Sequence, residues 1–232
     1  MSAPPKALGS PDCLATNKKG DTDHEKPLSA ALRLSRRLPR AGMTHNDYSR
    51  LLRRIQELQV RKERVIVAID GRCGSGKTTL AARLQKDLDC RVFHMDDFFL
   101  RPQQRTAERF AQPGENVDHE RFLEEVLLPL RSGQPVTYRP FSCAQQQLGA
   151  PVTAAPCRLA IVEGAYACHP DLWAYYDLRV FLTVDPETQM QRIEARSGAA
   201  KAAQFRDRWI PFEETYFSAL DVQARCDMCI SG

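Results

Sequence analysis

The fold of this chain is decided by the stretch Gly71-Arg72-Cys73-Gly74-Ser75-Gly76-Lys77-Thr78-Thr79. It follows a continuous apolar run, Val65 to Ile69, and precedes a segment with apolar residues at positions 80, 81, 84 and 88. The run is typical of a strand buried on both faces, and the later spacing is helical. The stretch itself satisfies G-x-x-x-x-G-K-[ST], the pattern of a phosphate-binding P-loop. We therefore predict a strand, a phosphate loop and a helix, in that order.

The chemistry of such a loop follows from its backbone. Glycines permit positive φ angles, so that successive N–H groups of residues 71–79 point at an anion, and the following helix adds its partial positive N-terminus. We expect Lys77 to reach the β- and γ-phosphates and the Thr78 hydroxyl to ligate magnesium. The sequence thus predicts ATP and Mg²⁺ as cofactors, with residues 71–79 as the nucleotide site. A Gly/Ser turn with a solvated lysine is the alternative.

Length and composition are those of one soluble domain with an extension. The chain has 232 residues, of which 43% are hydrophobic and 27% charged. Residues 1–64 hold 14 Lys and Arg against 7 Asp and Glu, whereas residues 65–232 hold 19 against 22. Since the basic excess lies outside the P-loop region, it gives no reason to propose nucleic acid as a partner. No apolar run has the length of a membrane span or forms a signal core, so we expect a cytoplasmic protein without a membrane partner.

The N-terminal part divides into an extension and a helix. Residues 1–42 are rich in Pro, Ser, Lys and Arg, which predicts a disordered extension before a domain of residues 43–232. Thr44 can cap a helix whose apolar residues stand at 48, 51, 52, 55 and 58. Because Met43 directly precedes this helix, we hypothesise that the natural product begins there.

An acidic pair follows the second predicted strand, residues 91–95. In an open parallel sheet, ligands bind beyond the carboxyl ends of the strands, and Asp96 and Asp97 fall at that place. One of them is well placed to accept a proton from a substrate hydroxyl or to hold a metal-bound water. The position after the strand leaves open which of Asp96 and Asp97 is the base. A capping or turn role is the alternative for either residue.

A second acidic position ends the third predicted strand, residues 159–164. Glu163 stands where the apolar run ends, so it can contact magnesium through water. Its alternative role is that of an ordinary strand-end carboxylate. A fourth strand covers residues 178–184, and residues 226–230 close the sheet. These segments predict an α/β fold, a doubly wound parallel sheet of about five strands.

The remaining segments surround this site. Asp118 is expected to cap a helix with an apolar face up to Leu130, after a polar loop of residues 101–116. Residues 134–141 and 151–155 predict a small β excursion that prolines keep off the central sheet. Arg192 and Arg196 share one face of the helix that begins after Asp185, and a lid carrying them would stabilise transferring phosphoryl charge. Arg206 and Arg208 follow; surface arginines are the alternative for all four.

Four motifs in this order resemble the uridine kinase-like P-loop kinases, which are related to phosphoribulokinase and bacterial pantothenate kinase. They are the nine-residue loop, Met95-Asp-Asp-Phe-Phe99, Asn116-Val-Asp-His-Glu-Arg-Phe122 and Val162-Glu-Gly-Ala-Tyr166, and the resemblance covers about residues 62–231. It implies that Asp96 is the base on a ribose hydroxyl and that Glu163 helps to hold magnesium. It also implies that the substrate is bound by residues of the second and third motifs and of the β excursion: Asp97, Phe99, Asp118 and Tyr138.

The sequence departs from the family at the acceptor side. Uridine kinases carry tyrosine where Phe99 stands, only Tyr138 matches their tyrosine and histidine arrangement, and their lid arginines are represented by Arg192 and Arg196. We therefore predict an ATP- and Mg²⁺-dependent kinase for a hydroxyl of a small molecule, a nucleoside resembling uridine or cytidine first. The alternatives are a kinase for another polyol or vitamin precursor, such as pantothenate, and a non-catalytic ATP-dependent switch. A homo-oligomer is compatible with all three.

Overall fold

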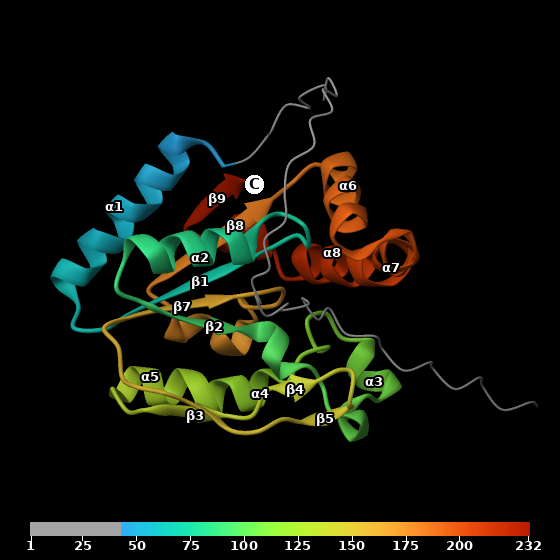
Figure 1. Cartoon of the computed structure of the whole chain (residues 1–232), viewed down its shortest axis with the longest axis horizontal. Coiled ribbons are helices and arrows are strands. Elements are labelled where there is room, and N and C mark those ends of the chain that lie inside the picture. The colour runs from blue at the N-terminus through green and yellow to red at the C-terminus, as the bar shows by residue number, and fades with distance from the viewer. Residues whose placement is uncertain (1–42) are drawn as a thin grey trace, which may run out of the picture.

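The structure, a computed structural model, describes residues 43–232. A five-stranded sheet lies at its centre, and helices cover both faces (Figure 1). The strands are parallel and stand in the order β2-β7-β1-β8-β9. Their bounds are β1 Val65–Gly71, β2 Arg91–His94, β7 Leu159–Glu163, β8 Leu178–Thr183 and β9 Met228–Ser231. The predicted doubly wound α/β sheet is confirmed.

Side chains of β1 alternate between two cores, because successive residues of a strand point to opposite faces. Val65, Val67 and Ile69 belong to the core that α1 (His45–Arg61) and α2 (Lys77–Asp87) cover. Ile66 and Ala68 belong to the opposite core, to which the helices of residues 119–132 and α8 (Ile210–Ala219) contribute. Since both faces are covered, all residues of β1 are buried, as its continuous apolar run predicts.

The register of the sheet brings three strand ends together. Ile69 of β1 and His94 of β2 both lie opposite Glu163 of β7. On the other side of β1, Leu182 of β8 lies opposite Gly71. Ligands of open parallel sheets bind beyond this edge. The P-loop, the segment after β2 and Glu163 therefore meet at one place.

The remaining elements form a lobe beside the sheet and a helical layer near the P-loop. The lobe holds η1 (Met95–Phe98), η2 (Pro102–Gln104), α3 (Ala107–Phe110), α4 (His119–Phe122), η3 (Leu123–Leu127), α5 (Leu128–Ser132), β3 (Val136–Tyr138), β4 (Phe141–Ser142), β5 (Gln147–Leu148) and β6 (Val152–Ala154). After β7 come η4 (Pro170–Tyr175), α6 (Pro186–Ser197), α7 (Ala199–Gln204), η5 (Phe205–Trp209) and α9 (Val222–Arg225).

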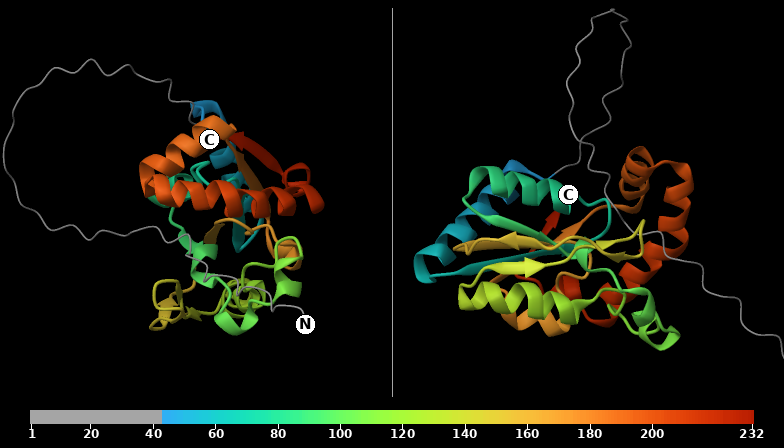
Figure 2. Two further views of the ribbon diagram at one scale, coloured as in Figure 1. Left: turned by 90° about the vertical axis from the view of Figure 1, so that its right-hand side faces the viewer. Right: turned by 60° about the horizontal axis from the view of Figure 1, so that its bottom comes forward.

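The predicted β excursion is confirmed. Strand β3 pairs antiparallel with β6, and β4 pairs with β5, both apart from the central sheet. Figure 2 shows these short yellow strands next to the green helices of residues 119–132. The excursion and the helices together enclose the aromatic residues that follow β2.

Three local predictions need correction. The second strand ends at His94 rather than at Met95, because Met95 begins the 3-10 turn η1. The helix after Asp118 is not continuous: a π-helical turn, η3, separates α4 from α5, which carries Pro129 in its first turn. The loop of residues 101–116 contains η2 and α3.

The N-terminal helix is confirmed, since the Thr44 side chain accepts a hydrogen bond from the Asp47 N–H and α1 follows. The expectations for residues 1–42, disorder included, lie outside the described residues. Among residues 43–232, no helix combines the length and the apolar character that a membrane crossing requires.

Candidate active site

The P-loop joins β1 to α2 through backbone that only glycine adopts readily. Gly71 has a φ of 129°, and a Cβ there would lie 2.0 Å from the carbonyl oxygen of Leu182. Gly76, with a φ of 100°, caps α2 without any side-chain hydrogen bond. The N-terminus of α2 therefore keeps its N–H groups directed at an anion site rather than at a side chain.

The side chains of the loop fit phosphate groups. Ser75 Oγ is buried and has no hydrogen-bond partner among residues 43–232. Lys77 Nζ donates to the carbonyl oxygens of Gly71, at 2.6 Å, and Arg72, at 3.1 Å. A buried hydroxyl without a partner carries a desolvation cost, which a phosphate oxygen would remove. The loop thus offers N–H groups, a hydroxyl and an ammonium group that suit phosphate oxygens.

A pocket of about 550 Å³ opens at this loop and is called the phosphate pocket below. Its walls combine the P-loop with the ends of β2 and β7 and with the helical layer. Its lining includes most of the predicted site: Cys73, Gly74, Ser75, Gly76, Lys77, Thr78, Thr79, Asp96, Glu163, Arg192 and Arg196. Of the nine loop residues, Gly71 and Arg72 lie behind the pocket rather than in its wall.

A hydroxyl and a carboxylate face each other across the pocket floor. Thr78 Oγ1 lies 3.2 Å from both Oε1 and Oε2 of Glu163. His94 Nδ1 lies 2.6 Å from Oε1 of the same carboxylate. These oxygen donors suit a hard cation such as Mg²⁺, which prefers oxygen ligands and keeps several waters. Thr78 and Glu163 would hold the ion, as the sequence predicts.

Asp96 lies in the same pocket, on η1. Burial raises the pKa of this carboxyl to about 7, and the negative charge of Glu163 adds to the rise, while Lys77 opposes it. A carboxyl with a pKa near neutrality is matched to general-base work at neutral pH. The raised pKa of Asp96 and its place in the pocket thus suit the predicted role of general base, whereas Asp97 does not line the pocket.

Asp97 faces the β excursion instead of the pocket. Its Oδ2 accepts a hydrogen bond of 3.0 Å from the Tyr138 hydroxyl. The Phe99 and Tyr138 side chains are buried in the large core of the lobe, and neither lines the pocket. The structure therefore separates these three predicted substrate residues from the phosphate pocket, although η1 keeps them next to Asp96.

Asp118 is held close to η1 by the backbone. Its N–H donates to the Phe98 carbonyl at 2.7 Å, and Phe99 pairs with Val117 through an isolated bridge. The Asp118 side chain caps α4 and is only 1% exposed. Its Oδ2 has no hydrogen-bond partner within the described part of the chain, and Arg101 Nε lies 3.5 Å away.

The guanidinium of Arg121 lies beside the Asp118 carboxylate. Arg121 Nη1 is also buried without a hydrogen-bond partner among the described residues, and it lies 4.0 Å from Asp118 Oδ2. The rest of its guanidinium donates to Glu125 and to the Arg139 carbonyl. A ligand hydroxyl that donates to Asp118 and accepts from Arg121 would satisfy both atoms.

The predicted lid arginines divide into two pairs. Arg192 Nη1 donates to the Gly74 carbonyl at 3.1 Å, and Arg196 stacks over Phe205; both line the pocket. Arg206 pairs with Asp207 at the surface, and Arg208 stacks over Trp209, so neither lines the pocket. Helix α6 therefore supplies the two predicted arginines that line the pocket.

Two acidic residues of α8, Glu213 and Glu214, contact the loop but do not stand out in the sequence. Arg72 is turned behind the loop, where it forms two hydrogen bonds with Glu214. Glu213, on α8, lines the pocket, is almost wholly buried and accepts from the Cys73 N–H at 2.9 Å. Burial raises the pKa of Glu213 above its ordinary value. The sequence signal that could have indicated this role is the acidic pair Glu213-Glu214, which stands inside the aromatic stretch of residues 209–217.

A second buried carboxylate, Asp70, supports the loop from below. It accepts hydrogen bonds from the Gly71 N–H, the Tyr166 N–H, the Cys168 N–H and the Tyr216 hydroxyl, at 2.6 to 3.2 Å. These bonds tie the end of β1 to the segment after β7 and to α8. The position of Gly71 therefore depends on three separate parts of the chain.

Comparisons with known structures agree with this architecture. A candidate fructose transport system kinase from Silicibacter sp. TM1040 is 26% identical, with a TM-score of 0.60 over 81% of this chain and 99% of that one. A possible uridine kinase from Bacillus stearothermophilus is 22% identical, with a TM-score of 0.53 over 78% and 98%. A circularly permuted candidate P-loop kinase from Saccharomyces cerevisiae is 12% identical, with a TM-score of 0.55 over 80% and 99%.

The sheet order and the loop at its edge define a P-loop kinase fold. Within that class, the fold is similar to that of the possible uridine kinase and of the candidate fructose transport system kinase, at low sequence identity. No protein-family model matches the sequence, and a search of curated proteins finds no match.

Proposed function

We propose that this protein transfers the γ-phosphoryl group of ATP to a hydroxyl of a small polyhydroxylated molecule, with a nucleoside as the first candidate. The observation that carries the proposal is the presence of Asp96 in the pocket formed by the P-loop. A binding protein needs the loop alone, whereas a kinase also needs a base beside the transferring group. Asp96 has the position and the raised pKa that this task requires.

Each side chain then has a part. The loop N–H groups, Ser75 and Lys77 bind and orient the phosphates, while Arg192 and Arg196 neutralise developing charge. Thr78 and Glu163 would hold Mg²⁺, which when bound neutralises the phosphate oxygens. Asp96 accepts the proton of the acceptor hydroxyl at its carboxylate oxygen. Because every one of these groups lines one pocket, little rearrangement is needed to assemble them.

The acceptor side supports a polyol. Within residues 43–232, Asp118 Oδ2 and Arg121 Nη1 are buried without hydrogen-bond partners, 4.0 Å apart, and a hydroxyl group can satisfy both. Neither group recognises a base specifically. A sugar is therefore the second candidate, because the relative that is 26% identical is named as a candidate fructose transport system kinase.

The test is ADP release from ATP and Mg²⁺ in the presence of uridine, cytidine, fructose, other sugars and pantothenate. Strong stimulation by one acceptor, lost in Lys77→Ala and in Asp96→Asn, is the expected result. The Arg206→Ala variant is the matched control, because this arginine pairs with Asp207 outside the pocket. ATP binding that no acceptor converts into turnover, and that Asp96→Asn leaves intact, would instead favour the ATP-dependent switch.

A further inference from the structure

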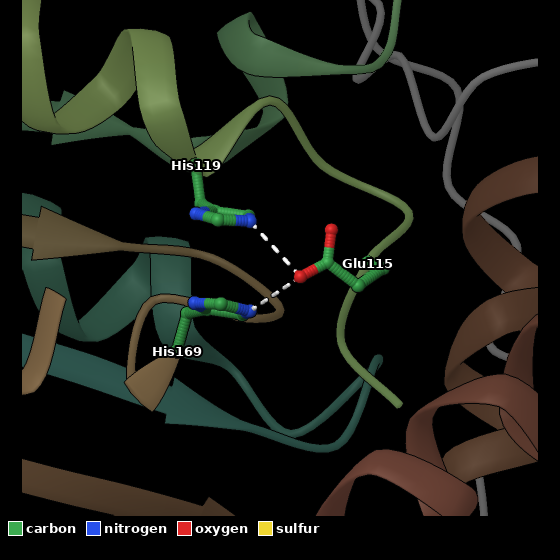
Figure 3. Close-up of side chains that lie close together, drawn as sticks. All are labelled: Glu115, His119 and His169. Carbon is green, nitrogen blue, oxygen red and sulfur yellow. Dashed lines mark hydrogen bonds and ion pairs between the residues drawn. The ribbon is translucent and has the colours of Figure 1, made fainter. Parts of the chain in front are cut away.

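A cluster of three metal-ligating side chains lies outside the phosphate pocket. Glu115 precedes α4, His119 is the first residue of α4, and His169 caps η4 after β7. Both histidines are 4% exposed, and their rings stack with centroids 3.8 Å apart and planes 17° apart. Figure 3 shows the two rings lying parallel, with one nitrogen of each directed at the Glu115 carboxylate. Neither histidine lines the phosphate pocket.

The distances in this cluster approach those of a metal site. Glu115 Oε1 lies 3.1 Å from His119 Nε2 and 3.6 Å from His169 Nε2, and the three ligand atoms lie within 4.8 Å of one another. Ligands at 2.0–2.2 Å from a tetrahedral zinc ion stand about 3.3 Å apart. The distances from Glu115 Oε1 to the two Nε2 atoms, 3.1 and 3.6 Å, lie on either side of that value. Because the two rings are stacked, each must also rotate until its Nε2 lone pair points at a common centre before an ion can bind.

The surroundings orient two of the ligands. Arg109 Nη2 lies 3.2 Å from Glu115 Oε2, which leaves Oε1 to face the rings. Asp171 Oδ2 lies 3.4 Å from His119 Nδ1, as the outer carboxylate of a carboxylate–histidine–metal arrangement does. Without an ion, His119 Nε2 donates to Glu115 Oε1 at 3.1 Å; metal binding at Nε2 would move that proton to Nδ1, where it faces the Asp171 carboxylate.

His169 needs a change of tautomer. Its Nδ1 accepts a hydrogen bond of 3.3 Å from the Asp171 N–H, so its Nε2 carries the proton directed at Glu115. Metal binding at Nε2 moves that proton to Nδ1 and breaks this long hydrogen bond. The loss is that of one weak hydrogen bond, which is small beside the free energy of binding a structural zinc ion.

We propose that Glu115, His119 and His169 bind one divalent transition-metal ion of the zinc class. Two imidazole nitrogens and one carboxylate oxygen suit zinc, whereas magnesium prefers oxygen ligands alone. The ion would join the segment before α4 to the segment after β7. Because His119 follows Asp118 directly, the bound ion would also fix the start of α4, the helix that Asp118 caps. Under the proposed function, Asp118 contacts the acceptor from this position.

The experiment is a zinc titration of the full chain after treatment with a chelator, by calorimetry and by metal analysis of the dialysed protein. We expect one zinc ion per chain and a higher unfolding temperature with zinc, since a ligand that binds the folded state stabilises it. Glu115→Gln and His169→Asn are expected to weaken zinc binding at least 10-fold. His45→Ala, on the exposed face of α1, is the matched control and keeps the ion.

Cobalt substitution identifies the ligands independently of folding. The expected spectrum is that of four-coordinate cobalt with nitrogen and oxygen ligands and no thiolate band. Absence of stoichiometric zinc in the folded wild-type protein would overturn the proposal. So would zinc that Glu115→Gln and His169→Asn retain, or zinc that is lost from Cys226→Ser instead, which would assign it to Cys226 and Cys229, a pair with C-x-x-C spacing near the end of the sequence. Circular dichroism of each variant shows that it is folded.

Discussion

Thr78 Oγ1 lies 3.2 Å from both carboxylate oxygens of Glu163, although 85 positions separate the two residues in the chain. The hydroxyl comes from the first turn of α2, and the carboxylate from the end of β7. Both positions are fixed by the parallel register in which Glu163 lies opposite Ile69, two residues before the loop begins. The closeness of Thr78 and Glu163 is therefore a property of the sheet register and not of a flexible loop.

Removing either partner is expected to weaken magnesium use. Thr78→Ala and Glu163→Gln should raise the Mg²⁺ concentration needed for half-maximal turnover by roughly 10–100-fold, the usual range for groups that support a metal site. Thr78→Ser, which keeps the hydroxyl, is the control and should stay close to wild type. A Mg²⁺ titration of initial rates at saturating ATP measures this. Unchanged titration curves in both variants would contradict the assignment.

The rate of phosphoryl transfer is expected to depend on pH through Asp96. Burial and the charge of Glu163 raise the pKa of Asp96 to about 7. A general base acts in its deprotonated form, so kcat/KM for the acceptor should rise with pH through about 7 and level off above it. Asp97→Asn removes a neighbouring negative charge that raises this pKa, so the midpoint should move to lower pH in that variant. The measurement is kcat/KM across about pH 5.5 to 9; a profile without this rise would exclude Asp96 as the base.

Asp118 and Arg121 are expected to act on the acceptor and not on the nucleotide. Asp118→Asn and Arg121→Gln should each raise KM for the acceptor by roughly 10–100-fold, which is the value of a hydrogen bond to a charged group. KM for ATP should change little, because neither residue lines the phosphate pocket. Initial rates with each substrate varied in turn make the distinction. Equal effects on both KM values would point to a folding defect instead.

The core of the site could be predicted from sequence because its signals are local. The β-branched run before Gly71, the loop pattern and the strand-end carboxylate at Glu163 each occupy a few adjacent residues. The strand order was not predicted, but it was not needed for the site, since parallel strands joined by helices bring their carboxyl ends to one edge in any order. Asp96, Lys77, Thr78 and Glu163 therefore meet as expected.

The parts that sequence reasoning missed depend on contacts between distant segments. Glu213 reaches the Cys73 N–H across 140 positions. Arg121 is significant because its Nη1 and Asp118 Oδ2 have no hydrogen-bond partner in the part of the chain that the structure describes. The stacking of His119 on His169 joins two segments 50 residues apart and has no periodic signature. Hydrophobic periodicity indicates which face of a helix or strand is buried, but it does not indicate which polar groups of distant segments contact one another.

The Tyr216 hydroxyl is expected to stabilise the base of the P-loop. It donates to Asp70 Oδ2 at 2.9 Å, inside the protein. Tyr216→Phe removes this donor but keeps the ring, so the free energy of unfolding should fall by about 1–3 kcal/mol, the cost of losing a hydrogen bond to a buried charged group. Urea denaturation measures the change. Tyr175→Phe, at the end of η4, is the control and should have a smaller effect, and equal losses in both variants would contradict the role of Asp70.

Glu213 is expected to lower stability as the pH rises. Burial raises the pKa of its carboxyl in the folded protein above the ordinary value of 4.5. The folded state therefore holds its proton more tightly than the unfolded state, and the stability that this contributes, full below pH 4.5, is lost as pH increases toward the folded pKa. Glu213→Gln cannot ionise, yet its amide oxygen can still accept from the Cys73 N–H. The variant should gain stability relative to wild type with increasing pH, by about 1.4 kcal/mol for each unit of pKa shift.

Urea denaturation of wild type and Glu213→Gln at acidic and at alkaline pH tests this expectation, because the difference between the two proteins isolates one carboxyl. Glu214→Gln is the matched control: its carboxylate is 43% exposed and pairs with Arg72, so no stability gain that grows with pH is expected. A difference between wild type and Glu213→Gln that stays constant with pH would mean that Glu213 titrates alike in the folded and unfolded states. The buried carboxyl would then be stabilised as an anion, with Lys77 as the nearest source of positive charge.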